Sequence, residues 1–346
     1  MKKSKIAAAI GNFDGVHRGH LFLIEQVIAF AHELGAEPGV VVFDPHPRRH
    51  FRPDDPPFLL TTPSTRANLI RAAGAAHVLT IEFNAATASM SAKDFVNRVL
   101  LDQFGLVGVM TGSEFRFGAG RSGDIGVLAE FCEHRGAVAR VGKLLIDDPQ
   151  QEKVSSSGVR EAIHHGEMAI ATKLLGRPWT ISGFVTSGQK LGRQIGFPTA
   201  NLVLGELIEP RRGVYAVDVV IGATSEQSRE EVGDTGPTAL RVPTESERGS
   251  RSSSRRVSLA DNRIHISARR SGGVEVRKGI ANFGRRPTVG APGPLLEVHI
   301  FDFEGDLYGE EITVSFKSFI RDEIKFENID ALKVQIHQDS LKARHL

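Results

Sequence analysis

The sequence GNFDGVHRGH, residues 11–20, stands between an apolar run at Ile6–Ile10 and an amphipathic stretch at residues 21–34. The run is typical of a buried strand, and the stretch carries apolar residues three and four positions apart, as a helix does. Glycines at 11, 15 and 19 let the backbone turn tightly and approach a ligand closely. Residues 11–20 therefore predict a glycine-rich, ligand-binding turn between a strand and a helix.

The same alternation continues through the first half of the chain. Further strands are predicted at residues 40–43, 78–81, 107–111 and 138–141, and further helices at residues 64–73, 92–104 and 124–134. Strands that alternate with helices predict a Rossmann-like α/β fold, in which helices cover both faces of a parallel sheet. Ligands of such sheets bind at the carboxyl ends of the strands, where the turn at residues 11–20 begins.

The pattern changes near residues 176–178. Two helices are predicted just before, at residues 155–164 and 167–175. Short β-rich runs follow at residues 180–185, 214–221, 295–303 and 312–316, and an amphipathic helix is predicted at residues 329–344. Such runs predict a small antiparallel β-barrel or sandwich. We therefore expect two domains, an α/β domain at residues 1–176 and a β domain with a C-terminal helix at residues 177–346.

Residues 222–275 belong to neither pattern. They are rich in Ser, Arg, Glu, Gly and Thr and contain no aromatic residue. Such a composition buries too little apolar surface to offset the entropy of ordering, so we predict a disordered insertion that loops out of the barrel. A passive loop is the simplest interpretation. An arm that contacts RNA or a membrane is the alternative, because arginines outnumber acidic residues there.

Composition narrows the class of protein. Hydrophobic residues make up 40% and charged residues 24% of the 346 residues, as in soluble globular proteins. The net charge of +2 gives no reason to expect a nucleic-acid partner. Cys132 is the single cysteine, which fits a reducing, cytoplasmic compartment. No apolar run approaches the roughly 20 residues that span a bilayer, so no membrane partner is expected. The sequence is compatible with oligomerisation but does not indicate it.

Two histidines, His17 and His20, lie where the first predicted helix begins. A helix N-terminus offers free N–H groups and a positive dipole to an anion. An imidazole pair beside such donors suits in-line attack on the α-phosphate of a nucleotide, because negative charge develops on that phosphate and on the leaving pyrophosphate. One isolated histidine would be explained better as an ordinary turn residue. Both histidines together with the glycines favour a phosphate site.

The turn resembles the HxGH signature of nucleotidyltransferases. In its GNFDGVH form it resembles the adenylyltransferase half of bacterial bifunctional riboflavin kinase/FAD synthetases. Further matches follow in the family's order at residues 43–47 (FDPHP), 112–118 (GSEFRFG), 121–124 (RSGD) and 154–160 (VSSSGVR). The last resembles an element that closes over the β- and γ-phosphates. Hydroxyls and N–H groups at a helix start, together with Arg160, make a good anion clamp.

The resemblance implies that His17 and His20 are catalytic in adenylyl transfer. It implies contacts with ATP and its phosphates at Gly11, Phe13, Asp14, Gly15, Gly19, Ser155, Ser156, Ser157 and Arg160. It implies a flavin or ATP pocket at Asp44, His46, Glu114, Arg116, Arg121 and Asp124. Two positions depart from the family pattern. Ser157 replaces the usual threonine and keeps the hydroxyl, and Glu114 replaces the usual Asp or Asn and adds a methylene.

A second and longer motif, GFVTSGQKLGRQIGFPTAN at residues 183–201, resembles the riboflavin kinase signature. Its glycine-rich part can wrap phosphates with backbone donors. The Thr199 hydroxyl and the Asn201 amide oxygen are hard ligands that suit Mg²⁺ bridging ATP phosphates, and the resemblance implies that role for both. It also implies contacts with ATP at Gly183, Gly188, Lys190, Gly192, Arg193 and Asn282.

Phosphorylation of a primary alcohol needs a group that accepts or orients the hydroxyl proton, and a carboxylate serves. The resemblance implies that Glu297, in the match at residues 297–303, is this catalytic residue. Glu310 and Glu311 are rival carboxylates in a predicted turn, and solvation is the simpler interpretation of both. The tail at residues 319–326 implies flavin contacts at Arg321 and Glu323.

The resemblance covers nearly the whole chain except the insertion, and it implies an enzyme with two sequential reactions. Riboflavin and ATP would give FMN at the C-terminal site, and FMN and ATP would give FAD and pyrophosphate at the N-terminal site. ATP and Mg²⁺ are implied for catalysis, with no tightly held prosthetic group. Two alternatives stay open: an enzyme that retains only one activity, and a catalytically silent flavin-binding protein. A silent protein would not need His17, His20, Thr199, Asn201 and Glu297 together.

Overall fold

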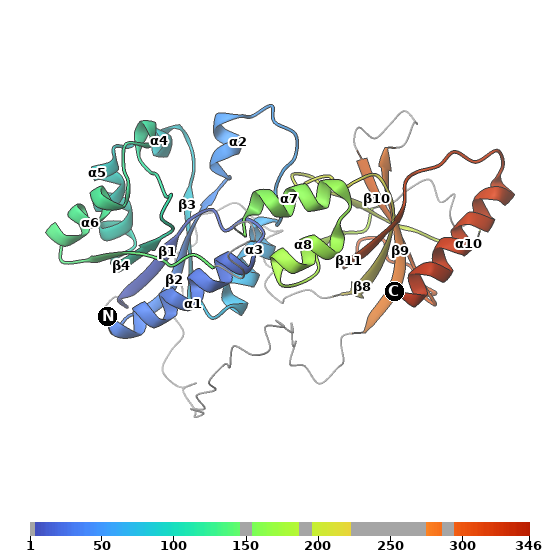
Figure 1. Ribbon diagram of the computed structural model, residues 1–346, viewed down its shortest axis with the longest axis horizontal. Coiled ribbons are helices and arrows are strands. Elements are labelled where there is room, and N and C mark those ends of the chain that lie inside the picture. The colour runs from blue at the N-terminus through green and yellow to red at the C-terminus, as the bar shows by residue number, and fades with distance from the viewer. Residues whose placement is uncertain (1–3, 146–153, 187–195, 223–274, 286–293) are drawn as a thin grey trace, which may run out of the picture.

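The computed structural model describes residues 4–145, 154–186, 196–222, 275–285 and 294–346. An N-terminal α/β unit and a C-terminal β unit follow each other along the long axis of the molecule, with helices α7 and α8 between them (Figure 1). The predicted combination of an α/β domain and a β domain is confirmed. Within the described residues, no helix has both the length and the apolar character that a membrane span requires.

A five-stranded parallel sheet forms the centre of the N-terminal unit, in the order β3-β2-β1-β4-β5. The strands are β1 (Ile6–Ile10), β2 (Glu37–Asp44), β3 (His77–Glu82), β4 (Leu106–Thr111) and β5 (Val138–Val141). Every strand predicted in this half is confirmed. The order reverses between β1 and β4, and such a switch point is where open α/β sheets bind their ligands. The turn at residues 11–20 leaves the sheet there.

Helices cover both faces of this sheet. Helices α1 (Arg18–Glu33) and α3 (Pro63–Ala72) pack on one face, and α5 (Ala92–Asp94), the π-helical segment η1 (Phe95–Gln103) and α6 (Ile125–His134) pack on the other. Successive strand residues point to opposite faces. Accordingly, Ala7 and Ala9 of β1 lie in the first core, and Ala8 and Ile10 lie in the second.

Three short segments were not predicted. They are α2 (Pro47–Phe51), α4 (Ala85–Ala88) and the 3-10 turn η2 (Ala119–Arg121). None of them is long enough to show a helical repeat of apolar residues. The helix predicted at residues 92–104 is present, but it changes from α to π geometry at Phe95.

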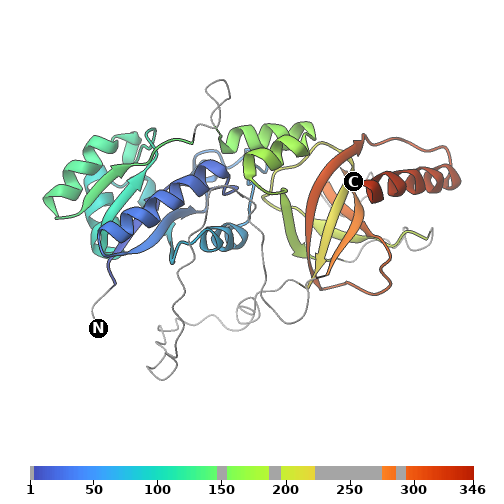
Figure 2. The same ribbon diagram turned by 60° about the horizontal axis from the view of Figure 1, so that its bottom comes forward.

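The C-terminal unit is a six-stranded antiparallel sheet in the order β6-β11-β8-β9-β10-β7. Its strands are β6 (Thr180–Phe184), β7 (Ala200–Val203), β8 (Gly213–Ile221), β9 (Val276–Arg285), β10 (Pro294–Ile300) and β11 (Glu311–Arg321). A bridge between Thr186 and Asn201 joins the two edges, so the sheet closes almost into a barrel. Helix α10 (Ile329–His345) packs on the outside of β8 and β9, as Figure 2 also shows.

Strands β8 and β9 flank the predicted insertion. The register pairs Val220 with Val276, so Gly222 and Glu275 lie at neighbouring strand ends. Apart from these two end residues, the segment predicted to be disordered lies outside the described residues.

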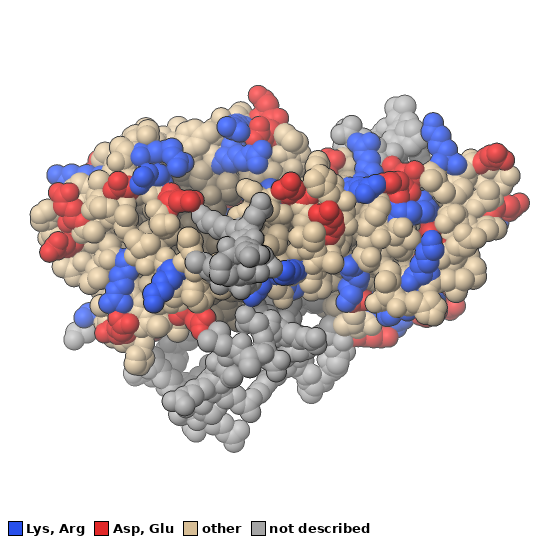
Figure 3. All heavy atoms as spheres, in the orientation of Figure 1, with Lys and Arg blue, Asp and Glu red and all other residues tan. Residues whose placement is uncertain are grey.

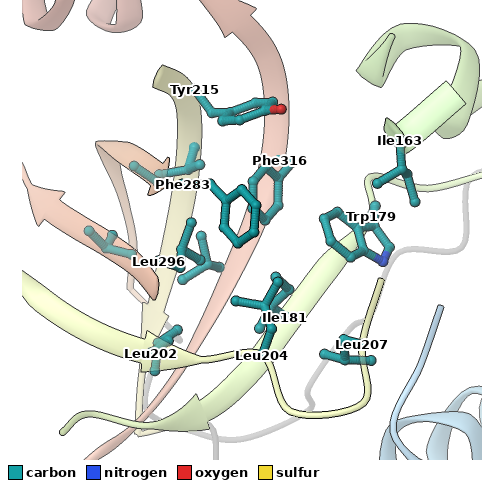
Figure 4. Close-up of a cluster of buried hydrophobic side chains, with 14 of the residues drawn as sticks. Ile163, Trp179, Ile181, Leu202, Leu204, Leu207, Tyr215, Phe283, Leu296 and Phe316 are labelled. Atoms are coloured by element: carbon teal, nitrogen blue, oxygen red, sulfur yellow. The ribbon is translucent and has the colours of Figure 1, made fainter. Parts of the chain in front are cut away.

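Helices α7 (Ser156–His165) and α8 (Met168–Leu175) connect the two units. Their apolar side chains belong to the same hydrophobic cluster as the barrel interior. Figure 4 shows part of this cluster, with Ile163 of α7 beside Trp179 and the barrel residues. Leu60 of the N-terminal unit belongs to it as well, and Trp179 Nε1 donates a hydrogen bond to the Leu60 carbonyl at 3.0 Å. The core therefore runs without a break from the barrel to the edge of the N-terminal unit.

Candidate functional sites

The turn after β1 has a strained backbone. Phe13 and Val16 have φ values of 50° and 42°, which place them in the left-handed region. That conformation is costly for a β-branched residue such as Val16. Gly15 has a φ of 82°, and a Cβ atom there would lie 2.7 Å from Leu60 Cδ1, so only glycine fits. The surrounding structure must hold this turn in place.

The Asp14 carboxylate is one of the groups that hold it. Asp14 is buried and accepts hydrogen bonds from the backbone N–H groups of Leu60 at 2.9 Å and Thr61 at 3.2 Å. It also accepts from Arg160 Nη2 at 2.6 Å. The Gly15 N–H donates to Thr61 Oγ1 at 3.1 Å. Asp14, for which the sequence predicts a phosphate contact, thus forms a buried link between the turn, residues 60–61 and α7.

The VSSSGVR element is docked on the same turn. Ser155 caps α7 by accepting from the Gly158 N–H at 3.2 Å, and Ser156 Oγ donates to the Asp14 carbonyl at 2.9 Å. Arg160 Nε also donates to the Phe58 carbonyl at 2.8 Å. The structure therefore brings Ser156 and Arg160 to the HxGH turn, as predicted for a clamp, with Ser157 exposed beside them.

His17 and His20 form a stacked pair. Their ring centroids lie 3.7 Å apart with 15° between the planes. His17 is the N-cap of α1, because its Nδ1 accepts from the His20 N–H at 3.3 Å. A neutral imidazole that accepts through Nδ1 carries its proton on Nε2. Nδ1 of His20 is buried and has no hydrogen-bond partner in the described part of the chain. Nε2 of His17 and the ring nitrogens of His20 can therefore form hydrogen bonds with a ligand.

Both histidines are neutral at pH 7. The pKa of His17 is lowered to about 4, mainly by burial and also by the positive charges of Arg160 and Arg177, while a backbone hydrogen bond opposes part of the shift. Burial also holds the pKa of His20 well below its usual range, with help from His17, Arg160 and Arg177. Neutral imidazoles act as hydrogen-bond donors without bringing extra positive charge into the buried site.

Two further arginines bind the turn and were not predicted from the sequence: Arg66, which is buried, and Arg177, which is partly buried. Arg66 of α3 donates to the carbonyls of Asn12 at 3.2 Å and Phe43 at 3.1 Å. Arg177 donates to the carbonyls of Gly15 at 2.7 Å and Val16 at 3.2 Å. Both arginines bind main-chain oxygens, which carry no signal in the sequence.

The predicted flavin or ATP pocket contains a third histidine with a lowered pKa. His46 caps α2 by accepting from the Arg48 N–H at 3.1 Å, and burial lowers its pKa to about 4. Its ring meets the buried Phe58 ring edge-on at 5.1 Å. Asp44, at the end of β2, lies 3.9 Å from Arg66. Asp44 and His46 are thus linked to the HxGH turn through Arg66 and Phe58.

The loop after β4 carries the remaining predicted pocket residues. It leaves the sheet beside the HxGH turn, because β4 pairs with β1. Arg116 Nη1 lies 3.5 Å from Asp124, which caps α6 by accepting from the Val127 N–H at 3.1 Å. Glu114 and Arg121 are exposed. The structure therefore brings this loop to the correct edge of the sheet, and the contacts of its side chains with a ligand stay predictions.

Three of the residues predicted for the kinase reaction lie in a row across three barrel strands. Glu297 of β10 pairs with Asn201 of β7 on one side and with Asn282 of β9 on the other. Their chain neighbours Leu202, Leu296 and Phe283 point into the barrel core. Because side chains alternate along a strand, Asn201, Glu297 and Asn282 share the outer face. We call these three residues the polar row.

Thr199 lies next to the polar row and is held there by a histidine that sequence reasoning missed. His299 follows Glu297 by two positions, so it lies on the same face of β10. Its Nδ1 donates to the Pro198 carbonyl at 2.8 Å, and the Phe197 ring meets its ring edge-on at 5.4 Å. These contacts fasten the backbone just before Thr199 to β10.

The two predicted flavin residues have different positions. A Cβ atom at Gly284 would collide with the Glu323 carboxylate, so Glu323 lies over β9 near the polar row. Arg321 turns toward α10 instead, where Nε and Nη2 bind the buried Asp339 carboxylate at 2.8 and 2.7 Å. Arg321 thus holds the C-terminal helix in this structure.

Other predicted kinase residues are only partly described. Gly183 lies in β6 opposite Ile312. Gly188, Lys190, Gly192 and Arg193 lie outside the described residues. Of the rival carboxylates, Glu310 lies in a turn and is exposed, and Glu311 begins β11.

Family models match both halves of the chain. The model for FAD synthetase matches residues 1–158, and the model for riboflavin kinase matches residues 175–346. The bifunctional riboflavin kinase/FMN adenylyltransferase of Pseudomonas fluorescens is 35% identical over 340 residues, which cover 98% of this chain and 92% of that protein. The protein of the same name from Escherichia coli K12 is 32% identical, with 97% and 90% covered.

A solved structure shares the whole fold. It is described as a macrolide-efflux protein from Streptococcus pneumoniae, and it superposes with a TM-score of 0.75 over 100% of this chain and 96% of its own. At 24% identity this likeness supports the architecture alone. The sequence matches carry more, since they extend over both units. The chain is an enzyme that belongs to the family of bifunctional riboflavin kinase/FMN adenylyltransferases.

Proposed function

We propose that FMN is adenylylated at the HxGH turn after β1 and that riboflavin is phosphorylated at the polar row on the barrel. The two reactions are those of the family: riboflavin and ATP give FMN, and FMN and ATP give FAD and pyrophosphate. For the first assignment the stacked, neutral pair His17 and His20 at the start of α1 is the main support. For the second it is the register that aligns Asn201, Glu297 and Asn282.

In adenylyl transfer, an FMN phosphate oxygen attacks the α-phosphorus of ATP while the bond to pyrophosphate breaks. The attacking phosphate is already an anion, so the site needs no base to activate it. Neutral His17 and His20 would donate N–H bonds to the α-phosphate and to the leaving pyrophosphate, where negative charge grows. The free N–H groups at the start of α1 add to this stabilisation.

In the kinase reaction, the terminal ribityl hydroxyl attacks the γ-phosphorus of ATP. We assign Glu297 to accept or orient the hydroxyl proton, as a carboxylate does in other phosphoryl transfers. The oxygens of Thr199 and the buried Asn201 fit Mg²⁺, which prefers hard oxygen ligands and keeps several waters. When bound, Mg²⁺ would neutralise charge on the ATP phosphates. His299 and Phe197 would keep Thr199 near Asn201.

The remaining predictions are also part of this proposal. We place the division between the adenylyltransferase and kinase domains after residue 176. Riboflavin, FMN and ATP are the proposed partners, and we propose no nucleic-acid partner. Acidic and basic side chains are interspersed on the face that Figure 3 shows. Use of ATP and the single, buried Cys132 support a cytoplasmic location.

Turnover of flavins by the purified full chain tests the proposal. With riboflavin, ATP and Mg²⁺, chromatography should show FMN first and FAD later. FMN without FAD would contradict the adenylyltransferase assignment, and no turnover would favour a silent flavin-binding protein.

Two variants assign the sites. We expect His20→Ala to make FMN but no FAD, and Glu297→Gln to make no FMN while it still converts supplied FMN into FAD. The exposed residues His32 on α1 and Glu304 after β10 provide matched controls, since His32→Ala and Glu304→Gln should retain both activities. Loss of both activities in a folded His20→Ala or Glu297→Gln variant would show that the sites are not independent.

A further inference from the structure

We propose that Arg177 is a positioning residue for adenylyl transfer, which holds the strained Gly15–Val16 turn so that His17 and His20 face the nucleotide. The residue stands at the junction of α8 and β6, outside the segment that contains the histidines. It acts through the turn rather than on a reacting atom. The inference rests on the proposed function of the HxGH turn.

The hydrogen bonds of Arg177 are aimed at the strained part of the turn. Nη2 donates to the Gly15 carbonyl at 2.7 Å, and Nη1 donates to the Val16 carbonyl at 3.2 Å. Nη1 also donates to the Leu175 carbonyl at 3.4 Å, which ties the guanidinium to the end of α8. One planar, charged group thus fixes the orientation of two consecutive peptide units.

The orientation of those two peptide units determines the direction in which the chain enters His17. Gly15 and Val16 both have positive φ values, 82° and 42°. A relaxed Val16 would leave the left-handed region, and the direction of the chain into His17 would change with it. His17 would then lose the geometry in which its Nδ1 caps α1 and its ring stacks on His20. The cost of the Val16 conformation must be offset by contacts around the turn, and the Arg177 guanidinium is the charged group that binds the Val16 carbonyl.

Arg177 also contributes to the electrostatics of the histidine pair. Arg177 is partly buried, and its burial lowers its pKa to about 10, so it stays protonated at pH 7. Its charge lowers the pKa of both His17 and His20, together with burial and Arg160. A single cation therefore orients the turn and helps keep the imidazoles neutral.

Gly15 also contacts a residue of the hydrophobic cluster that fills the barrel. Gly15 packs against Leu60, and Trp179, two residues after Arg177, donates from Nε1 to the Leu60 carbonyl at 3.0 Å. Leu60 and Trp179 both lie in the barrel cluster. Gly15 and the chain segment that carries Arg177 are therefore both attached to this cluster, which defines the position of Arg177 relative to the turn.

The test compares Arg177→Met and Arg177→Lys in the full chain. Arg177→Met keeps an apolar stem of similar length and removes every donor. We expect kcat for FAD synthesis from supplied FMN to fall about 100-fold, because a catalytic group displaced by about 1 Å can cost that much. The KM for ATP should change less than about threefold, since the remaining phosphate contacts are untouched. Lysine keeps the positive charge but has a single ammonium group in place of the planar guanidinium, so kcat for FAD synthesis in Arg177→Lys should lie between the values of wild type and Arg177→Met.

Two further readouts separate positioning from general stability. First, Arg177→Met should phosphorylate riboflavin at the wild-type rate. The matched control is Arg135→Met, which removes an exposed arginine at the C-terminal end of α6 and should leave both activities unchanged. The acid limb of the pH profile for FAD synthesis should move to higher pH in Arg177→Met, because the pKa of His17 and His20 rises when the positive charge is lost. The pKa of each histidine should stay below its usual value even in this variant, because burial and the charge of Arg160 remain.

Three outcomes would overturn the proposal. They are unchanged FAD synthesis in Arg177→Met, equal loss in Arg177→Met and Arg177→Lys with no change of pH profile, and a parallel fall of both activities with the melting temperature. The His20→Ala variant keeps this test separate from the proposed function. If His20→Ala still made FAD, the HxGH assignment would fail whatever Arg177 does.

Discussion

The two sites are held together in different ways. The HxGH turn depends on side chains from distant parts of the chain: Asp14 binds residues 60–61 and Arg160, and Arg177 binds Gly15 and Val16. The polar row depends on main-chain pairing, because Asn201, Glu297 and Asn282 occupy facing positions on three adjacent strands. We expect a site made by a sheet register to lose less activity when one side-chain contact is removed. A site made on a strained turn should lose more.

The largest effect should come from removing the central contact of the turn. Asp14→Ala leaves Arg160 without its carboxylate and two buried N–H groups without an acceptor. Removing one partner of a buried ion pair costs about 3–5 kcal/mol. We expect FAD synthesis to fall at least about 1000-fold while FMN synthesis persists below the new melting temperature. Chemical denaturation and both flavin assays measure this.

The control for Asp14→Ala is Asp102→Ala, which removes an exposed partner of Arg135. It should change neither activity. If Asp14→Ala kept a rate of FAD synthesis within tenfold of wild type, the turn would not depend on this side chain, and the contrast with the polar row would be wrong.

An intermediate effect is expected where the kinase site does depend on a side chain. His299→Phe deletes the hydrogen bond to the Pro198 carbonyl and frees the backbone before Thr199. We expect riboflavin phosphorylation to fall about tenfold to 100-fold, with a higher Mg²⁺ concentration needed for half-maximal rate. FAD synthesis from supplied FMN should be unchanged.

His299→Asn sharpens this experiment, because the asparagine Nδ2 can donate from nearly the position of the histidine Nδ1. It should restore most of the rate and the normal Mg²⁺ dependence. Equal activity in His299→Phe and wild type would mean that strand pairing alone positions Thr199, which would strengthen the contrast with the turn.

A smaller, graded effect concerns pH. The unfolded chain titrates its histidines near pH 6.5, whereas burial lowers the pKa of His17 and His46 to about 4 and lowers that of His20 as well. Between these limits the unfolded state binds more protons than the native state, so the free energy of unfolding decreases as pH falls from 6.5 toward 4. Denaturant titrations at pH 7 and pH 5 check this.

NMR of the ring protons of His17 and His20 measures the same shifts directly. Neither ring should titrate between pH 8 and pH 5, because burial lowers the pKa of both. A midpoint near 6.5 for either buried ring would contradict the neutral pair. Arg177→Met should raise the midpoint of His17.

The smallest effect on stability should come from removing an exposed ion pair between the two units. Arg49 and Glu206 form an ion pair in which the glutamate side chain is 61% exposed. Exposed pairs contribute about 0–1 kcal/mol, so Glu206→Gln should shift the free energy of unfolding by less than about 1 kcal/mol. Both activities should be unchanged. A larger loss would show that the two units are held together by charge and not mainly by the buried cluster around Leu60 and Trp179.

Much of the fold follows from local patterns in the sequence. Apolar periodicity predicts the five parallel strands and their main helices, because each must bury one or two faces. Motif spacing predicts the HxGH turn, and the polar row brings together Asn201, Asn282 and Glu297, which the resemblance named one by one. Short segments such as α2 and α4 leave no periodic signal.

What the sequence did not predict is mostly non-local. Arg66 and Arg177 bind carbonyl oxygens, which every residue carries, so no pattern marks their partners. Asp14 and Arg160 stand in two separate motifs, and no local pattern shows that they form an ion pair with each other; their contacts with phosphates stay predictions. The packing of α7 and α8 on the barrel also escaped prediction, since an apolar helix face does not say which domain it will cover.

The hairpin of β8 and β9 has a consequence for how this chain can change over time. Val220 and Val276 face each other, so the connecting segment leaves and re-enters the sheet at adjacent points. The entropic contribution to the free energy of closing a flexible loop increases by only about 0.6 kcal/mol for each doubling of the loop length. A sequence inserted between residues 222 and 275 therefore has only to join two neighbouring strand ends, which the pairing of β8 and β9 holds in place. A foreign domain whose own ends lie close together could be grafted there, with the strand register as the only requirement at the junction.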